Sequence, residues 1–261
     1  MPNIVVLIKQ VPDTWSERKL TSGDYTLDRE AADAILDEIN ERAVEEALLI
    51  KEAQGGEVTV LAMGPERATE AIRKALSMGA DKAIHVKDEA IHGSDAVQTA
   101  YVLAAALGQI EGIELVIAGN EATDGRSGAV PAIIAEYLGL PQLTHLRKLT
   151  VDGERISGER ETDEGVFKLE ATLPAIVSVT EKINEPRFPS FKGIMAAKKK
   201  GVQTFTLADL GVDPETVGVA NAGTQVTGVT PKPARTAGEK IVDEGEGGQQ
   251  IATYLVGQKI I

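Results

Sequence analysis

Short apolar runs alternate with longer segments of helical spacing over the first 142 residues, and this alternation limits the chain to few folds. The apolar runs at residues 3–10, 57–63, 82–87 and 115–118 have the length of strands. The run at 4–8 is almost continuously apolar, which is typical of a strand with helices on both faces of its sheet. Strands and helices in this order form parallel sheets with right-handed crossovers. We therefore predict an α/β fold with a three-layer α/β/α arrangement, which binds ligands beyond the carboxyl ends of its strands.

Helix signals separate these runs, because apolar residues recur at steps of three and four between Gly and Pro breaks. The expected helices are residues 30–54, a segment between Pro65 and Gly79, a segment from Ser94 or Asp95 to Leu107, and a segment entered through Pro131.

The pattern changes after residue 143. Residues 143–151, 155–162 and 166–172 read as strands joined by short turns, so an antiparallel β extension is expected. Residues 175–179 form another buried strand, and the nucleotide-binding domain is expected to span 1–183.

The rest of the chain divides into residues 184–203, which we interpret as a partner-recognition loop, and an extended C-terminal arm, 204–261. From residue 208 the arm is rich in Gly, Thr, Pro and Asp and has no strong period before residue 249. Such a segment cannot bury a core of its own, so it is either disordered or laid along another protein. Its apolar end favours a partner.

Composition excludes several classes. A formal net charge of −13 argues against nucleic acid as a general partner. No apolar run approaches the roughly 20 residues of a membrane span, so the chain is expected to be cytoplasmic and not membrane-embedded. Cysteine is absent, and His85, His92 and His145 lack metal-ligand spacing, so no metal site is expected.

A glycine-containing loop links the strand at 115–118 to the helix at Pro131. Gly119, Gly125 and Gly128 permit close approach of the backbone, and unpaired N–H groups at a helix start favour a phosphate. The alternative is a flexible turn without a ligand. The loop matches neither the phosphate loop of nucleotide triphosphatases nor the dinucleotide fingerprint.

Five longer motifs carry a more specific resemblance. They are IKQVPD at 8–13, INERAVEEAL at 39–48, GPERATEAIRKALSMGADKAIHV at 64–86, GNEATDGRSGAVP at 119–131 and NEPRFPSFKGIMAAKKK at 184–200. In this order they resemble the beta subunits of electron transfer flavoproteins, with most similarity to actinobacterial members. The likeness covers essentially the whole chain.

The resemblance implies a fold like that of the adenine nucleotide alpha hydrolases, and a heterodimer with an alpha subunit that holds most of one FAD. It also implies an AMP of structural role in this chain. Acyl-CoA dehydrogenases of fatty acid beta-oxidation and other flavin dehydrogenases would donate electrons, and a quinone oxidoreductase would pass them to the respiratory chain. The chain would be a carrier subunit without catalytic residues, because the redox chemistry belongs to the flavin.

The resemblance also implies which residues bind the nucleotide. Leu7 would line the adenine pocket, Val60 and Met63 would flank the purine, and Asp37 stands where the AMP-binding form commonly has asparagine. The phosphate loop would comprise Gly119, Asn120, Glu121, Ala122, Thr123, Asp124, Gly125, Arg126, Ser127, Gly128, Ala129 and Val130. Arg126 would either pair with a phosphate or project to solvent.

The loop departs from the AMP-binding form after Asp124. Its Asp-Gly sequence and its Val-Pro helix start are more similar to the electron-bifurcating branch, whose beta subunit holds a second FAD. AMP and a second FAD therefore both stay open.

Partner recognition is assigned through the resemblance to Phe191, Ile194, Met195 and Lys198. Phe191 stands at the position of a leucine anchor that enters an apolar pocket on the dehydrogenase. The alternative is that Phe191 packs within its own subunit.

Two other functions would need different sequence features. A stand-alone nucleotide-binding sensor similar to universal stress proteins would not need the 184–200 segment or the apolar tail. An adenylating enzyme would need a pyrophosphate loop that the sequence lacks. The carboxylates of Asp37, Glu38, Glu45 and Glu46 are interpreted as a capped and solvated helix face.

Overall fold

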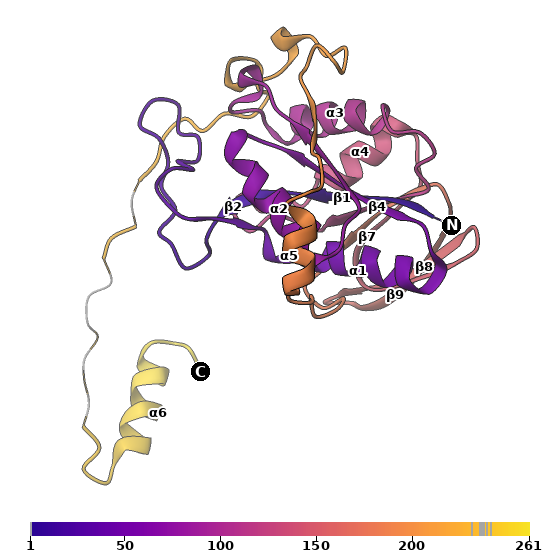
Figure 1. Cartoon of the computed structure of the whole chain (residues 1–261). Coiled ribbons are helices and arrows are strands. Elements are labelled where there is room, and N and C mark those ends of the chain that lie inside the picture. Colours follow the sequence, from indigo (N-terminus) through magenta and orange to yellow (C-terminus); the bar gives the residue numbers. More distant parts are fainter. Residues whose placement is uncertain (1, 231, 235–237, 239, 241) are drawn as a thin grey trace. The chain divides into compact units, whose positions relative to one another are not determined.

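The computed structural model of the chain describes residues 2–230, 232–234, 238, 240 and 242–261. The chain forms two units, Met1–Thr227 and Gly228–Ile261. Each unit is described by itself (Figure 1).

A nine-stranded sheet organises the first unit, in the order β11-β5-β4-β1-β6-β10-β7-β8-β9. The strands from β11 to β7 are parallel, whereas β7, β8 and β9 are antiparallel. Their bounds are β1 Asn3–Ile8, β4 Glu57–Met63, β5 Lys82–Val86, β6 Leu115–Gly119, β7 Gln142–Asp152, β8 Arg155–Thr162, β9 Gly165–Thr172, β10 Ala175–Val179 and β11 Gln203–Phe205. The predicted parallel sheet and its antiparallel extension are confirmed.

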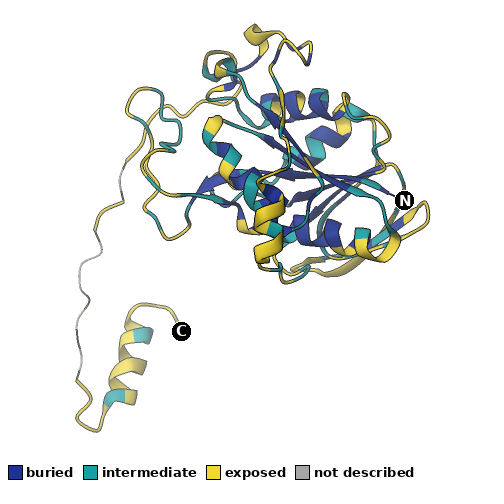
Figure 2. Cartoon of the chain, in the orientation of Figure 1, coloured by how far each residue is buried: buried dark blue, intermediate teal, exposed yellow. Residues whose placement is uncertain are grey.

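Helices cover both faces of this sheet (Figure 1). Helices α1 (Glu38–Gln54) and α2 (Thr69–Met78) pack on one face, and α3 (Ala96–Leu107) and α4 (Val130–Leu138) pack on the other. Alternate residues of β1 enter the two cores: Ile4 and Val6 lie on the α1 side, and Val5 and Leu7 on the α3 side. Buried residues therefore run along the central strands (Figure 2), and the three-layer prediction is confirmed.

The direction in which successive strands are added to the sheet reverses at β1. The chain proceeds from β1 to β4 and β5 on one side, then crosses to β6 on the other side. The connections that follow β1 and β6 consequently lead to helices on opposite faces of the sheet, and this topological switch point is where sheets of this type bind ligands.

Helix α1 begins eight residues later than the helix predicted over 30–54, which is a correction. Residues Ala34–Leu36 form strand β3, which pairs with β2 (Gln10–Pro12) in a separate two-stranded sheet. Asp37 then caps α1. The predicted caps of the other helices are confirmed: Gly79 ends α2, Asp95 makes a capping box on α3, and Pro131 lies in the first turn of α4.

The start of the C-terminal arm is also corrected. Residues 203–205 pair with β5, and Leu207, Leu210, Val212 and Val217 are buried in the core on the α3 side. The arm therefore begins at Gly228 rather than at residue 204. The sequence did not predict this packing because its apolar residues have no helical or strand period. The segment instead contains two short 3-10 turns, Pro214–Thr216 and Val219–Asn221.

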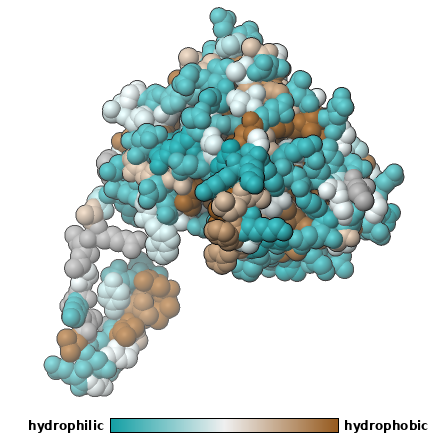
Figure 3. All heavy atoms as spheres, in the orientation of Figure 1, coloured by the Kyte–Doolittle hydropathy of each residue, from teal (hydrophilic) through white to brown (hydrophobic). Residues whose placement is uncertain are grey.

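The second unit contains helix α6 (Gly247–Gly257). Its apolar side chains Ile251, Tyr254 and Val256 are exposed, as are Ile260 and Ile261 after it. Apolar atoms are visible on its surface in Figure 3. Residues 231, 235–237, 239 and 241 of the predicted arm lie outside the described residues. Within the described part of the chain, no helix has the length and apolar character needed to cross a membrane.

Two further 3-10 turns, Glu66–Ala68 and Glu89–Ile91, lie before α2 and α3. A seven-residue helix, α5 (Phe191–Ala197), lies against α2 within the predicted recognition loop.

Candidate functional site

The loop between β6 and α4 lies at the switch point, directly after the strand that pairs with β1. Gly119 ends β6, and a Cβ at this position would stand 2.5 Å from Asn40 Nδ2. The absence of a side chain therefore lets Asn40 reach the residue that follows β1, where its Oδ1 accepts a 2.7 Å hydrogen bond from Lys9 N–H. Glycine at position 119 thus allows β6, α1 and the residue after β1 to pack closely together.

Asp37 lies beneath this loop with no exposed surface. Its Oδ1 accepts hydrogen bonds from the N–H groups of Ile39 and Asn40 at the start of α1. Its Oδ2 accepts from Thr123 N–H at 2.7 Å and from Thr123 Oγ1 at 2.8 Å. Both oxygens are thus occupied by protein donors, and the carboxylate joins α1 to the loop.

Asp124 follows in the same loop and has a side chain that is only 3% exposed. Its Oδ1 lies 2.8 Å from Lys9 Nζ and accepts from Gly125 N–H, and its Oδ2 lies 3.7 Å from the Arg29 guanidinium. Burial lowers the pKa of Arg29, and the charge of Asp124 opposes that shift. Arg29 also donates to Gln10 O, so this cluster connects the loops that follow β1 and β6.

The tip of the loop faces solvent at Gly125, Arg126 and Ser127. Arg126 and Gly128 have φ angles of 49° and 66°. Among the described residues, none accepts a hydrogen bond from the N–H groups of Ser127, Gly128 or Val130. Free N–H groups at the start of α4, together with the helix dipole, form an arrangement that favours an anion.

Arg126 has a side chain that is 70% exposed, and its guanidinium lies 3.8 Å from Glu121 Oε1. It contacts another residue of the same loop and extends toward solvent. The remaining residues named for the loop, Asn120, Ala122 and Ala129, lie between these contacts.

The three apolar residues predicted around the purine do not share one face. Leu7 packs in the core on the α3 side, and Met63 lies against that same core. Val60 is fully buried in the core on the α1 side, because it pairs with Val6 rather than with Leu7. The structure therefore brings Leu7 and Met63 to one side of the sheet and places the Val60 side chain on the other.

One amide at the switch point, that of Gln10, was not among the residues predicted from the sequence, whereas Asn120 was. Gln10 is 3% exposed, and neither its Oε1 nor its Nε2 has a hydrogen-bond partner among the described residues. The buried Oδ1 of Asn120 likewise has none there, although its Nδ2 lies 3.3 Å from His145 Nδ1. Buried polar groups without partners are costly, so such atoms commonly mark a bound ligand or water. The signal in the sequence for Gln10 is its position shortly after the buried strand β1.

The predicted recognition residues lie together on α5. Phe191 is 79% exposed, Ile194 and Met195 are about half-exposed, and Lys198 follows the helix and is exposed. This exposure is contrary to the alternative in which Phe191 packs within its own subunit. The outer surface of α5 presents apolar side chains to solvent.

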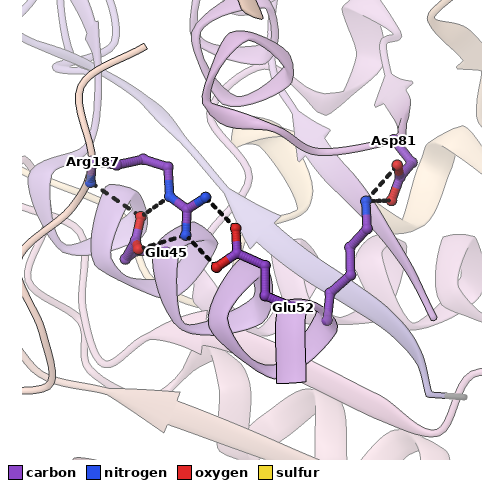
Figure 4. A network of polar contacts seen from close by, with 5 residues as sticks. Glu45, Glu52, Asp81 and Arg187 are labelled. Carbon is purple, nitrogen blue, oxygen red and sulfur yellow. Dashed lines mark hydrogen bonds and ion pairs between the residues drawn. The ribbon is translucent and has the colours of Figure 1, made fainter. Parts of the chain in front are cut away.

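The prediction that Glu45 and Glu46 lie on a solvated face is wrong. Both are buried, because the chain at 184–187 lies across α1. Glu45 pairs with Arg187, and Glu46 Oε2 accepts from Asn184 Nδ2 at 3.0 Å (Glu45 and Arg187 in Figure 4). Burial raises the pKa of Glu46 above its ordinary value.

Comparison with known proteins identifies the family. Residues 24–210 match the protein-family model of the electron transfer flavoprotein domain. The chain is 75% identical, over the full length of both proteins, to electron transfer flavoprotein subunit beta of Mycobacterium tuberculosis H37Rv. The chain belongs to the electron transfer flavoprotein beta-subunit family. Electron transfer flavoprotein subunit beta of Thermoanaerobacterium thermosaccharolyticum is 39% identical, and subunit CarD of the caffeyl-CoA reductase-Etf complex of Acetobacterium woodii is 36% identical, each over 91% of both chains.

The predicted resemblance is thereby confirmed, and the mycobacterial relatives agree with its actinobacterial character. Membership of this family makes the chain a subunit of an electron transfer flavoprotein. A beta subunit implies an alpha subunit as its partner.

Proposed function

We propose that this beta subunit binds an adenine nucleotide at the switch point between β1 and β6, with the phosphate on the loop from Gly119 to Val130. The N–H groups of Ser127, Gly128 and Val130 carry this proposal, because none has an acceptor among the described residues and all three lie at or just before the start of α4. The Gln10 amide and Asn120 Oδ1, which have no partner among the described residues, would supply hydrogen-bonding groups for the same ligand.

The residues around this site divide into two roles. Leu7 and Met63 line the side of the sheet that faces α3, where an adenine ring would contact them. Asp37 and Asp124 act as positioning residues, because their oxygens are taken up by Thr123 and by Lys9. Arg126 is free to turn toward a phosphate from its exposed position.

AMP is the nucleotide that we propose, with a structural role. The alternative is a second FAD, as in the electron-bifurcating branch. The experiment is to denature the purified heterodimer and identify the released nucleotides by chromatography. One FAD with one AMP supports the proposal, two FAD support the alternative, and one FAD without any further nucleotide refutes both.

We also propose that the chain is a cytoplasmic carrier subunit that receives electrons from acyl-CoA dehydrogenases and other flavin dehydrogenases. A quinone oxidoreductase would then pass them to the respiratory chain. The flavin, held mainly by the alpha subunit, supplies the redox chemistry. In this chain, Phe191, Ile194, Met195 and Lys198 would form the surface that docks on the dehydrogenase.

Docking through Phe191 has a measurable consequence. Burying this side chain in a partner pocket contributes about 2–3 kcal/mol, so Phe191→Ala should raise KM for the carrier in a dehydrogenase assay by roughly 30- to 150-fold. The flavin spectrum should stay unchanged. Phe167→Ala is the control, because Phe167 is an exposed aromatic residue on β9. Equal KM values for the two variants would refute the docking role of Phe191.

The C-terminal arm is proposed to pack on the alpha subunit through the exposed apolar residues of α6. Deleting residues 228–261 should abolish the heterodimer in size-exclusion chromatography. A stand-alone nucleotide sensor would keep its oligomeric state after this deletion.

A further inference from the structure

The docking segment, residues 184–200, is attached to α1 just before it forms helix α5. Arg187 Nε and Nη2 donate to the two carboxylate oxygens of Glu45 at 2.8 and 2.9 Å, and Arg187 N–H donates to Glu45 Oε2. The same guanidinium donates to Glu52 at 2.5 and 3.1 Å. Figure 4 shows it between the two carboxylates, which lie seven residues apart on one face of α1.

This arrangement differs from an ordinary surface ion pair. The Glu45 side chain is 6% exposed and that of Arg187 is 33% exposed, so solvent screens the pairing only in part. Its bonds with Arg187 lower the pKa of Glu52, and the two carboxylates raise that of Arg187. Asn184 extends the attachment, because it donates to Arg42 O and Glu46 and its carbonyl accepts from the Arg42 guanidinium.

A second attachment holds the end of the segment. Arg73 of α2 donates to the carbonyls of Ala197 and Lys200, both at 2.7 Å, and so binds acceptors at the carboxyl end of α5. Within α5, a Cβ on Gly193 would stand 2.3 Å from Ser77 O, so the two helices are in close backbone contact.

The residues between these two attachments would not form a stable helix by themselves. Helix α5 has seven residues, and a helix of this length is not stable in water by itself. Its apolar residues Phe191 and Met195 point to solvent and contribute little core packing. The geometry of the docking surface therefore depends on the contact of α5 with α2 and on what fixes the two ends of the segment.

We infer that Arg187 is a positioning residue for partner docking: by bridging Glu45 and Glu52 it holds the entry to α5, so that Phe191, Ile194 and Met195 are presented together before a dehydrogenase arrives. This inference rests on the proposed docking function. Without the bridge, the segment would have to be ordered at each encounter, which raises the cost of binding but leaves the flavin untouched.

The test compares the complete heterodimer with its Arg187→Ala variant. Hydrogen exchange should be at least tenfold faster in the amides of residues 188–197, and KM for the carrier in a dehydrogenase assay should rise about tenfold. kcat should stay within twofold, because the electron-transferring group is unchanged. The flavin spectrum and the rate of reduction by dithionite should match those of the parent.

Two milder variants keep the test decisive if Arg187→Ala fails to assemble. Arg187→Lys keeps the charge but cannot bind two oxygens of Glu45 in parallel, so its exchange rate and KM should fall between those of the parent and the alanine variant. Glu52→Gln removes only the more exposed carboxylate and should act in the same direction. Arg155→Ala, which breaks an exposed ion pair with Glu170 on the β extension, is the matched control and should change neither quantity.

The outcomes separate this inference from the docking proposal. If Phe191→Ala leaves KM unchanged, the docking surface is wrong, whatever Arg187 does. If Phe191→Ala raises KM while the folded Arg187 variants show parental exchange and KM, the docking surface stands and the positioning role is overturned. Faster exchange at parental KM also overturns it, because order in the segment would then not matter to docking.

Discussion

Asp37 offers a direct test of how the candidate nucleotide loop is held. Replacing it with alanine removes the N-cap of α1, which costs about 1 kcal/mol. It also leaves the buried N–H of Thr123 without its acceptor, which costs a further 1–3 kcal/mol or so. We therefore expect Asp37→Ala to lower the free energy of unfolding by about 3 kcal/mol.

The assay is urea unfolding of the full chain followed by far-UV circular dichroism. Asp37→Asn is the informative control, because its Oδ1 can still cap α1 while its amide group faces the N–H of Thr123. Its loss should be smaller, about 1–2 kcal/mol. Thr123→Val, which removes only the hydroxyl, allows a double-mutant cycle with Asp37→Ala.

Two results would refute this account. A loss below about 1 kcal/mol for Asp37→Ala would mean that the loop is not held through this carboxylate. Additive losses for Asp37→Ala and Thr123→Val would mean that the two side chains do not interact, against the 2.8 Å hydrogen bond between them.

Three other expectations follow from packing and burial. Gly119→Ala should cost roughly 1–3 kcal/mol in the same unfolding assay, because its Cβ would meet Asn40 at 2.5 Å. Burial raises the pKa of Glu46 in the folded chain above its ordinary value of 4.5, so the free energy of unfolding of the parent falls as the pH rises from about 4.5 to the raised pKa. Glu46→Gln has no such titration and should therefore become more stable relative to the parent over this pH range. A chain ended at Thr227 should keep the thermal unfolding transition of the first unit, whereas one ended at Val202 should lose it, because four buried side chains worth roughly 6–12 kcal/mol together are removed.

Each of these has a control or a contrary outcome. Gly125→Ala has open space around its Cβ, so an equal loss there would disprove the steric argument for Gly119. A stability difference between Glu46→Gln and the parent that does not change between pH 4 and pH 7 would mean that the carboxylate is not effectively buried. Cooperative melting of the chain ended at Val202 would show that residues 203–227 are not part of the core.

Local sequence signals are sufficient to predict the alternating layers and most helix ends. Gly79, Asp95 and Pro131 act on the backbone of their own helix, so their effect can be predicted without knowing the neighbours. The long motifs also identified the family, and the loop at 119–130 lies where the parallel strands indicated.

Which polar residues are buried, and on which face of the sheet each side chain lies, depends on the packing of distant segments. Glu45 looks like a solvated helical residue until Arg187, 142 positions away, lies against it. Val60 and Leu7 take opposite faces because the register between β1 and β4 pairs Val60 with Val6. Residues 203–217 join the core through strand pairing with β5 and through apolar side chains without a period. The local sequence pattern predicts the conformation of a segment. Its burial depends on distant segments that the fold brings into contact with it.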